Sequence, residues 1–396
     1  MIKKQTPFKV MKLKLLNYEE KKHREQVASL WSIAFRGGGP YTPDEKLVSE
    51  DAQAIVAYLH DTLVGAYRVL DLSATRERTR LKVGGIAGVA IKLEYRKKGL
   101  GSQLMHSAIN LLYENKVHLS ALYAFKESYY RTFGFECVGT RYHIKCAPQN
   151  FPRVTTSLPI HQISYQDFQC LQPAYESFAK RYNGMNLPRH PARWKALLSV
   201  KHKEPLIFTV GDPIAGYAVF RLTENFWQDQ PIAEVVWTTP EAYQALLGLF
   251  ASLGINRSAI LWHEPADSPF LISYRDRGVS VESKHPVMFR VVHLPSALQA
   301  LQPSDKGDFT IRIADPLLKE NEGPWRIHFD ENHVSIEKTT KAELETDIRS
   351  FTQGLLGEPS FKTLARNGML SVHQQKALDA LLRLCPPGFV YCLDVY

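Results

Sequence analysis

Residues 89–102 form the part of this sequence whose residue types and spacing most directly imply chemistry. They comprise three apolar strand residues, three basic loop residues and the glycine-bearing start of a helical pattern, namely Val89, Ala90, Ile91, Arg96, Lys97, Lys98, Gly99, Leu100, Gly101 and Ser102. The first turn of a helix exposes unpaired backbone N–H groups and a partial positive charge, and glycine lets an anion approach the backbone closely. We predict that this loop binds a pyrophosphate, with an ordinary strand-to-helix turn as the alternative.

A second pattern, at residues 121–135, places two adjacent tyrosines, Tyr129 and Tyr130, before Gly134. A tyrosine hydroxyl aimed at a leaving group can donate a proton to it, so Tyr130 is a candidate general acid. The alternative is that Tyr130 packs the end of a helix that Gly134 caps. Tyr129 is the better candidate for packing alone.

The elements around these patterns predict three domains. Strand patterns at residues 54–59, 63–70, 82–91 and 117–123 alternate with helical patterns at 19–35 and from residue 100 onward, which indicates an α/β unit at 1–150. A similar order recurs at 206–220 and 232–253, after the prolines at 148 and 152. Short strands at 309–313 and 325–329, with helices at 341–355 and 372–384, indicate an α+β unit. The expected domains are therefore 1–150, 151–288 and 289–396.

The second unit is expected to have no phosphate site. Where the first unit has its basic glycine loop, the second has Thr238-Thr239-Pro240-Glu241-Ala242. We therefore interpret it as a degenerate copy of the first unit.

The loop at residues 96–101 resembles the R/Q-x-x-G-x-G/A loop of the GNAT superfamily of acetyltransferases. That resemblance implies acetyl-CoA as the cosubstrate, with its pyrophosphate on Arg96 to Ser102. It also implies that Val89, Ala90 and Ile91 offer their backbone edge to the pantetheine arm.

Residues 121–135 further resemble the enhanced intracellular survival (Eis) family, in which a segment close to A-L-x-x-S-E-x-x-x-Y-x-R-F-G-Y carries a tyrosine that acts as general acid. Tyr130 matches that tyrosine. Phe125 and Lys126 stand where the family often has Ser-Glu, so backbone contacts of Phe125 with the cofactor are expected in place of side-chain contacts.

The Eis resemblance extends over the whole chain. It implies tandem GNAT folds, the first active and the second degenerate, followed by a sterol-carrier-protein-like α+β domain. In that last domain, Asp315 and the Asn321-Glu322-Gly323-Pro324-Trp325 turn look like the family's D…N-x-G-x-W hairpin. Eis proteins end at an aromatic residue whose free carboxylate accepts the amine's proton, and Tyr396 takes that place here. The alternative is a terminus that only packs. The resemblance also implies a hexamer.

Composition excludes several other classes of protein. The net charge of +9 comes from Lys and Arg spread along the chain, which does not indicate nucleic-acid binding, and an anionic cofactor accounts for part of it. The five cysteines and fourteen histidines lack metal-site spacing. No apolar segment is long enough for a signal or a membrane span. We expect a cytoplasmic protein without a metal.

These patterns predict an acetyl-CoA-dependent N-acetyltransferase that transfers acetyl directly to a primary amine. The expected acceptor is aminoglycoside-like, polyamine-like or a lysine amine, bound by acidic side chains that the sequence does not identify. Two alternatives remain. One is a non-catalytic protein that binds CoA or a lipid, and the other is a protein-lysine acetyltransferase with a macromolecular partner.

Overall fold

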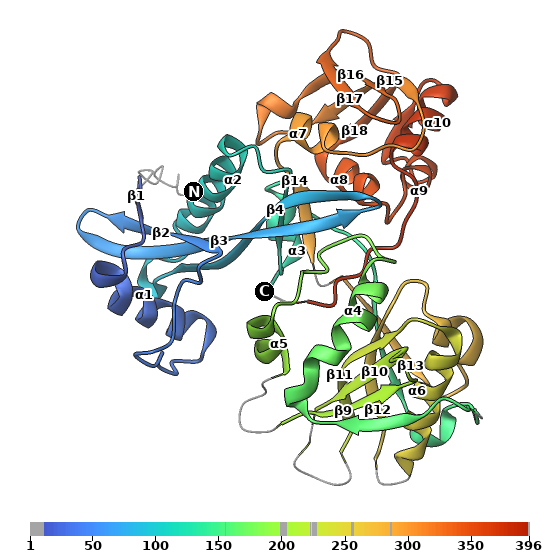
Figure 1. The fold of residues 1–396 in the computed structure, drawn as a ribbon. Coiled ribbons are helices and arrows are strands. Elements are labelled where there is room, and N and C mark those ends of the chain that lie inside the picture. Colours follow the sequence, from blue (N-terminus) through green and yellow to red (C-terminus); the bar gives the residue numbers. More distant parts are fainter. Residues whose placement is uncertain are drawn as a thin grey trace, which may run out of the picture.

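The computed structural model describes residues 12–154, 156–198, 204–221, 223, 228–254, 257–285 and 287–394. It shows three lobes that meet near the centre of the molecule (Figure 1). The N-terminal lobe is blue to cyan, the central lobe is green to yellow and the C-terminal lobe is orange to red. The predicted α/β and α+β fold class is confirmed.

A seven-stranded sheet in the order β1-β2-β3-β4-β5-β14-β6 forms the N-terminal lobe. Its strands are β1 (Lys14–Asn17), β2 (Ala52–Leu59), β3 (Thr62–Arg76), β4 (Thr79–Ile91), β5 (Leu119–Leu122), β14 (Met288–Val291) and β6 (Glu136–Cys137). Its helices are α1 (Glu20–Phe35), α2 (Leu100–Glu114) and α3 (Glu127–Arg131), and the helical turn η1 (Leu93–Tyr95) follows β4.

Helices α1 and α2 cover opposite faces of this sheet. Val27 and Trp31 of α1 pack with Val56 and Ala66, whereas α2 packs in a separate apolar cluster with Val64. Alternate residues of a strand point to opposite faces, so one strand supplies both layers. Gly84 of β4 permits the close approach of α2, because a Cβ there would come within 2.1 Å of Leu112 Cδ2. This packing fixes where α2 begins relative to the end of β4.

The central lobe also has a seven-stranded sheet, in the order β13-β7-β12-β11-β10-β9-β8. Its strands are β8 (Ile160–Ile163), β9 (Leu206–Val210), β10 (Gly216–Phe220), β11 (Gln230–Trp237), β12 (Ile260–Pro265), β13 (Ser280–Lys284) and β7 (Arg141–Cys146). Its helices are α4 (Gln172–Ala179), α5 (Pro191–Leu198) and α6 (Pro240–Ser252), with the turns η2 (Pro148–Asn150), η3 (Tyr165–Leu171) and η5 (Phe270–Tyr274).

The two lobes exchange a strand. β7 lies before residue 150 in the chain but pairs with β12 and β13 of the central sheet. β14 begins at Met288, after the central elements, and pairs with β5 and β6 of the N-terminal sheet. The domain boundaries expected near residues 150 and 288 stay a prediction. Each of the two sheets nevertheless includes one strand from the far side of an expected boundary, β7 in the central sheet and β14 in the N-terminal sheet.

The C-terminal lobe contains a five-stranded sheet in the order β17-β16-β15-β18-β19. Its strands are β15 (Gly307–Ala314), β16 (Gly323–Phe329), β17 (Val334–Lys338), β18 (Leu344–Asp347) and β19 (Leu370–Val372). Its helices are α7 (Leu294–Gln299), α8 (Ile348–Leu356), α9 (Phe361–Arg366) and α10 (Gln375–Leu384), with the turn η6 (Lys319–Asn321).

The helix predicted at residues 341–355 was wrong in its first part. Leu344 and Ile348 stand four residues apart, a spacing that suggested one continuous helix. Instead Leu344 pairs with Ile311 as part of strand β18. Helix α8 begins only at Ile348, because the Asp347 carboxylate accepts a hydrogen bond from the Ser350 N–H at 2.8 Å and caps the helix.

The segment after α10 leaves the C-terminal lobe and enters the region between the other two lobes (Figure 1). Val390 bridges to Asn183, and Tyr391 is buried among the aromatic residues of the central core. All five cysteines are free thiols. Within the described ranges, no helix is long and apolar enough to cross a membrane.

Candidate functional site

The loop between β4 and α2 has the geometry of an anion cradle. Lys97 has a φ of 60° and Gly99 a φ of 78°, so the chain turns sharply just before α2 begins at Leu100. A Cβ on Gly99 would meet no atom within 4 Å, so this backbone faces open space. No side chain among the described residues caps the first turn of α2. The N–H groups of that turn therefore remain available to an anion.

The basic residues of the loop are solvent-exposed around these N–H groups. Arg96, Lys97 and Lys98 are all exposed, as is Gly99. Arg96 Nε donates to the Ile91 carbonyl at 3.0 Å, and Lys98 Nζ donates to the Glu94 carbonyl at 2.9 Å. Both side chains thus stay close to the loop, where their charge adds to that of the helix N-terminus.

Strands β4 and β5 separate next to this loop. They pair in parallel only from Val83–Leu119 to Gly85–Ala121, and beyond that β4 continues to Ile91 paired with β3 alone. A bulge at Gly88, with a φ of 61°, bends β4, and Trp31 Nε1 donates to the Gly88 carbonyl at 2.7 Å. Val89, Ala90 and Ile91 therefore lie on the part of β4 whose β5-facing edge has no strand partner in the described sheet.

Tyr130 lies in α3, directly after β5, and is 7% exposed. Its ring packs edge-on against Phe125, Tyr129 and Phe135. Burial, and secondarily the neighbouring Tyr129, raise the pKa of Tyr130 to about 12. The phenol is therefore protonated at neutral pH and can donate a proton.

Tyr129 and Phe125 lie beside the same loop. A Cβ placed on Gly101 would lie 3.4 Å from the Tyr129 hydroxyl, so this tyrosine reaches the start of α2. Phe125 is 80% exposed and contacts both tyrosine rings. The structure thus gathers β4, the loop, Phe125 and both tyrosines at one place.

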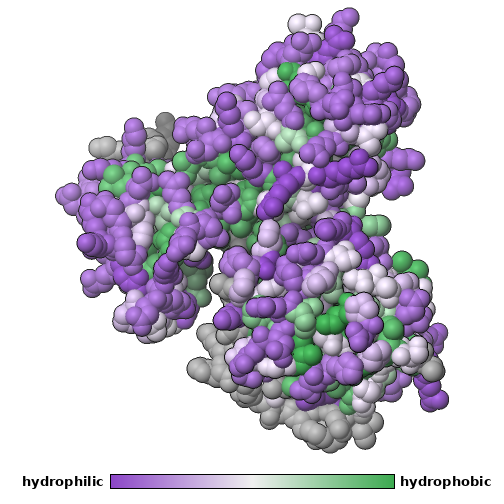
Figure 2. All heavy atoms as spheres, in the orientation of Figure 1, coloured by the Kyte–Doolittle hydropathy of each residue, from purple (hydrophilic) through white to green (hydrophobic). Residues whose placement is uncertain are grey.

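A cleft of about 1280 Å³ opens between the end of β5 and the central sheet. Tyr123, Ala124 and Glu127 line it from the N-terminal lobe, and Leu393 lines it from the C-terminal segment. Strands β7, β10, β11, β12 and β13 and helix α5 of the central lobe supply most of the remaining wall. Figure 2 shows the largely hydrophilic surfaces of the lobes, with hydrophobic side chains gathered where they meet.

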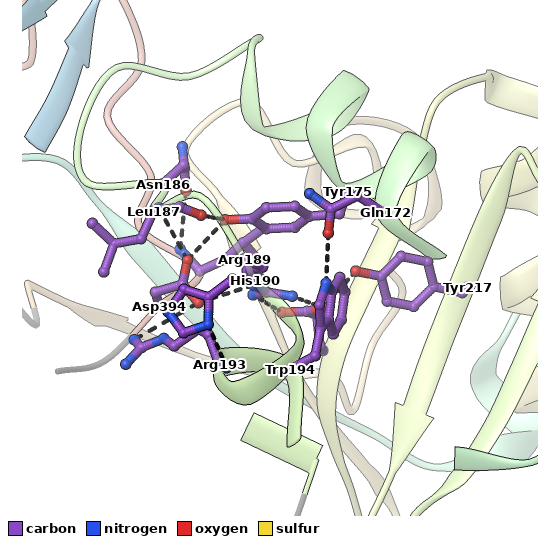
Figure 3. Close-up of polar contacts among 12 residues, drawn as sticks. Gln172, Tyr175, Asn186, Leu187, Arg189, His190, Arg193, Trp194, Tyr217 and Asp394 are labelled. Carbon is purple, nitrogen blue, oxygen red and sulfur yellow. Dashed lines mark hydrogen bonds and ion pairs between the residues drawn. The ribbon is translucent and has the colours of Figure 1, made fainter. Parts of the chain in front are cut away.

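The C-terminal segment is anchored beside this cleft through Asp394, which is 1% exposed (Figure 3). The Asp394 carboxylate accepts hydrogen bonds from the Tyr175 hydroxyl at 2.8 Å, the Arg189 Nε at 3.0 Å and the Leu187 N–H at 3.2 Å. The Asp394 backbone carbonyl accepts from the Tyr123 hydroxyl at 2.7 Å. Asp394 therefore ties the central lobe to the end of β5.

Three family models match the chain in the order of its lobes. Acetyltransferase (GNAT) domain models match residues 17–138 and 185–291, and a sterol carrier protein domain model matches residues 294–393. The two GNAT matches together span more than half of the chain. This chain is a GNAT acetyltransferase. A comparison with curated proteins found no match.

Several solved structures share the complete fold of this GNAT acetyltransferase. A probable N-acyltransferase from Enterococcus faecalis V583 is 22% identical with a TM-score of 0.85, and a GCN5-related N-acetyltransferase from Anabaena variabilis is 19% identical with a TM-score of 0.82. Eis1 from Mycobacterium abscessus is 18% identical with a TM-score of 0.78. Each similarity covers 97% of this chain and 100% of the other. The predicted resemblance to the Eis family is confirmed at the level of its three-domain architecture.

Not every predicted site residue of the acetyltransferase can be placed. Tyr396 lies outside the described residues, which end at Asp394. Sequence reasoning also missed the residues that hold Asp394, above all Arg189, which is 4% exposed and pairs with both Asp394 and Glu234. A lone arginine in a central-domain loop gave no signal before the fold brought residues 189, 234 and 394 together. The described residues contain no group of His, Cys, Asp and Glu side chains that could hold a metal ion.

Proposed function

We propose that this acetyltransferase transfers the acetyl group of acetyl-CoA directly to a primary amine of a small molecule. The observation that carries the proposal is a convergence at one end of β5. Ile91 at the unpaired edge of β4, Leu100 at the open N-terminus of α2 and the protonated Tyr130 share one apolar cluster with Leu122 of β5. Just beyond β5, Ala124 and Glu127 line the cleft.

The residues of the loop fit acetyl-CoA. The N–H groups of Leu100, Gly101 and Ser102, with Arg96, Lys97 and Lys98 around them, would hold the pyrophosphate. The free edge of Val89, Ala90 and Ile91 would bind the pantetheine arm through backbone hydrogen bonds. Phe125 would supply backbone contacts, as predicted, and its exposed ring adds an apolar wall. When bound, acetyl-CoA supplies an acetyl group activated as a thioester.

Tyr130 would act as the general acid. Its raised pKa keeps the proton on Oη at neutral pH, and its ring belongs to the apolar cluster that contains Ile91 of β4 and Leu122 of β5. Proton donation from Oη to the departing thiolate removes the cost of releasing that anion into an apolar site.

The terminal carboxylate of Tyr396 would act as the general base that accepts the proton of the amine. The anchoring of Asp394 supports this role, because Tyr123 of the N-terminal lobe and Arg189 of the central lobe hold the chain two residues before its last one. A terminal carboxylate normally has a pKa of about 3.3 to 3.7, so a desolvated setting or a relaying water is needed to make it an effective base.

The test is thiol release from acetyl-CoA with a panel of primary amines. Tyr130→Phe should lower kcat by about 10² to 10⁴-fold while acetyl-CoA binding is kept, and extension of the chain beyond Tyr396 should also abolish most activity. Tyr129→Phe is the matched control, because it keeps the aromatic ring and removes only the neighbouring hydroxyl, which lies at the loop.

Two results would replace this proposal with one of the alternatives. If the protein does not bind acetyl-CoA, the non-catalytic lipid-binding function is favoured. If it binds acetyl-CoA and acetylates protein lysines but no free amine, it is a protein-lysine acetyltransferase. The hexamer that the Eis resemblance implies remains a prediction, which light scattering on the full chain can test.

A further inference from the structure

The wall of the cleft that belongs to the central sheet is basic. Arg141, His143 and Lys145 alternate along β7 and so share one face of the sheet. On the neighbouring strands, His263 and Glu282 stand opposite His143, and Lys284 stands opposite Arg141. This composition is the reverse of the acidic pocket expected for a polycationic acceptor.

Most charges of this wall are already paired within the protein. Glu234 accepts hydrogen bonds from Arg189 at 2.8 Å and from the Tyr217 hydroxyl at 2.6 Å. Glu282 pairs with Lys284 at 3.0 Å, and Lys145 pairs with Asp229 at 2.6 Å. The two carboxylates that the central sheet contributes to the cleft are thus neutralised and offer little attraction to a cationic ligand.

Arg141 is different, because among the described residues its guanidinium faces the Tyr391 ring at 6.0 Å and pairs with no carboxylate. Its Nε is buried and has no acceptor. His263 Nδ1, on the facing strand, is likewise buried without a partner. A buried guanidinium donor without an acceptor is unfavourable and calls for an anion. Arg221, an exposed residue of the same cleft, adds a second positive charge that no described carboxylate pairs with.

The wall that the N-terminal lobe contributes to the cleft has the other sign. Glu127, in the first turn of α3, is an exposed carboxylate three residues before Tyr130. An amine drawn toward this wall approaches the place where β4 and β5 separate. The cleft is therefore polarised, with a carboxylate next to the transfer site and guanidinium groups on the central sheet.

From this arrangement we propose that the acceptor is a zwitterionic amine, whose carboxylate or phosphate binds Arg141 while its primary amine faces α3. Arg221, farther along the same wall, adds to the positive field that attracts the anion. This inference rests on the proposed function and narrows the acceptor to amines that carry an anionic group. A free amino acid with a side-chain amine fits, whereas an aminoglycoside or a polyamine does not.

The experiment measures kcat/KM for linear ω-amino carboxylates of increasing length. Each is matched with the alkylamine, the α,ω-diamine and the ω-aminoalkyl phosphate of equal length. We expect the best anionic amine to exceed its diamine counterpart by at least about tenfold. The carboxylate and phosphate series then show which anion the site prefers.

Variants assign the effect to the guanidinium groups. Arg141→Gln should lower kcat/KM for the anionic amine by about ten- to a hundredfold and leave the alkylamine within about twofold, whereas Arg141→Lys should retain part of the preference. Arg277→Gln, at an exposed loop position of the same lobe, is the matched control. Arg221→Gln, also exposed, provides a second variant should Arg141→Gln fail to fold.

Two outcomes would overturn the inference while the proposed function stands. One is faster acetylation of the diamines than of the anionic amines. The other is an equal loss on all amines in Arg141→Gln, as expected if Arg141 only supports the protein's own structure. If wild type binds acetyl-CoA and acetylates no amine of any series, the proposed function itself fails.

Discussion

The two GNAT lobes differ most clearly at the N-terminus of one helix. In the N-terminal lobe, α2 starts after Gly99 with no side-chain cap among the described residues. In the central lobe, α6 starts with Pro240, which has no N–H, and the Thr239 hydroxyl accepts a hydrogen bond from the Ala242 N–H at 3.1 Å. The second position of the helix is Gly101 in one lobe and Glu241 in the other.

This difference separates the requirements of stability from those of binding. A capped helix with an acidic first turn is the more stable arrangement, because its donors are satisfied and its dipole is complemented. The helix that binds an anion must leave those donors open. The central lobe therefore has the more stable arrangement, whereas the N-terminal lobe leaves open the donors that the proposed pyrophosphate site needs.

The lobes also differ in how they satisfy a buried ionisable side chain. Glu264 of the central lobe accepts from Tyr243 at 2.6 Å and from Trp262 at 2.7 Å, all within that lobe. Arg290, in the N-terminal sheet, instead donates to Asp315 of the C-terminal lobe at 2.7 Å and to the Phe133 carbonyl beside α3. The helix that carries Tyr130 thus depends on another lobe.

The largest effect should follow from breaking this inter-lobe pair. Arg290 and Asp315 are both 0% exposed, so Arg290→Met leaves an unpaired buried carboxylate and should lower the free energy of unfolding by about 3–5 kcal/mol. Urea unfolding measures the loss. The double variant Arg290→Met/Asp315→Leu removes both charges and should recover most of it. A double variant as unstable as the single one would contradict the assignment.

The next largest effect tests the helix comparison directly. Gly101→Glu gives α2 the residue that α6 has at its second position. The new carboxylate should repel the pyrophosphate and so weaken acetyl-CoA binding roughly a hundredfold. Stability should hardly change, because an acidic residue in the first helical turn is favourable. Isothermal titration measures the affinity. Glu241→Gly is the matched control and should create no CoA site, since Thr239 and Pro240 remain.

If Gly101→Glu binds acetyl-CoA as tightly as wild type, the pyrophosphate binds elsewhere. The difference between the N-termini of α2 and α6 would then have no bearing on cofactor binding. A Cβ on Gly101 meets only the Tyr129 hydroxyl, at an ordinary contact distance of 3.4 Å. A loss of affinity could therefore not be ascribed to a gross steric clash within the protein.

Local patterns explain what could be predicted from the sequence. The loop at residues 96–102, the strands β2, β3 and β4 and the three-domain order all rest on residues close together in the chain. The exchange of β7 and β14 could not be predicted, because strand periodicity gives the faces of a strand but not its partner. The pairing of Arg189 with Asp394 spans 205 residues and has no local signature.

The basic cleft escaped prediction for the same reason. Arg141, His263 and Lys284 are far apart in the sequence and become neighbours only through the pairing of three strands. The position of the Tyr129 hydroxyl could not be predicted for a different reason. Two adjacent tyrosines in a short helix point in different directions, and the sequence alone does not say which one faces the loop. The structure places the Tyr129 hydroxyl beside Gly101, next to the predicted cofactor loop.

A smaller effect should follow from loosening the anchor that joins the lobes. Asp394→Asn keeps an acceptor for Tyr175 but removes the charge that Arg189 pairs with. We expect kcat to fall about tenfold, with acetyl-CoA affinity unchanged, because charge-assisted hydrogen bonds hold the chain near its end. Steady-state kinetics measures both values. Asp305→Asn, an exposed residue of the C-terminal lobe, is the control and should behave as wild type.

The smallest effect concerns the histidines of the central sheet. At the matching place in the N-terminal sheet, β5 and β14 pair Leu122 with Met288 and Ala121 with Phe289. Burial, and then the neighbouring Arg141, lower the pKa of His263 from 6.5 to about 3. Between these two pH values the unfolded chain binds a proton that the folded chain does not, so acidification should lower stability through this window.

His263→Gln should lose less stability than wild type when the pH falls from neutral through this window, because the variant has no proton to gain there on unfolding. Urea midpoints at several pH values give the comparison. His328→Gln, an exposed residue of the C-terminal lobe, is the matched control and should follow wild type. Parallel pH dependence in His263→Gln and wild type would mean that His263 is protonated in the folded cleft. The central sheet would then present a further positive charge to the acceptor, and the preference for an anionic amine should grow at acidic pH.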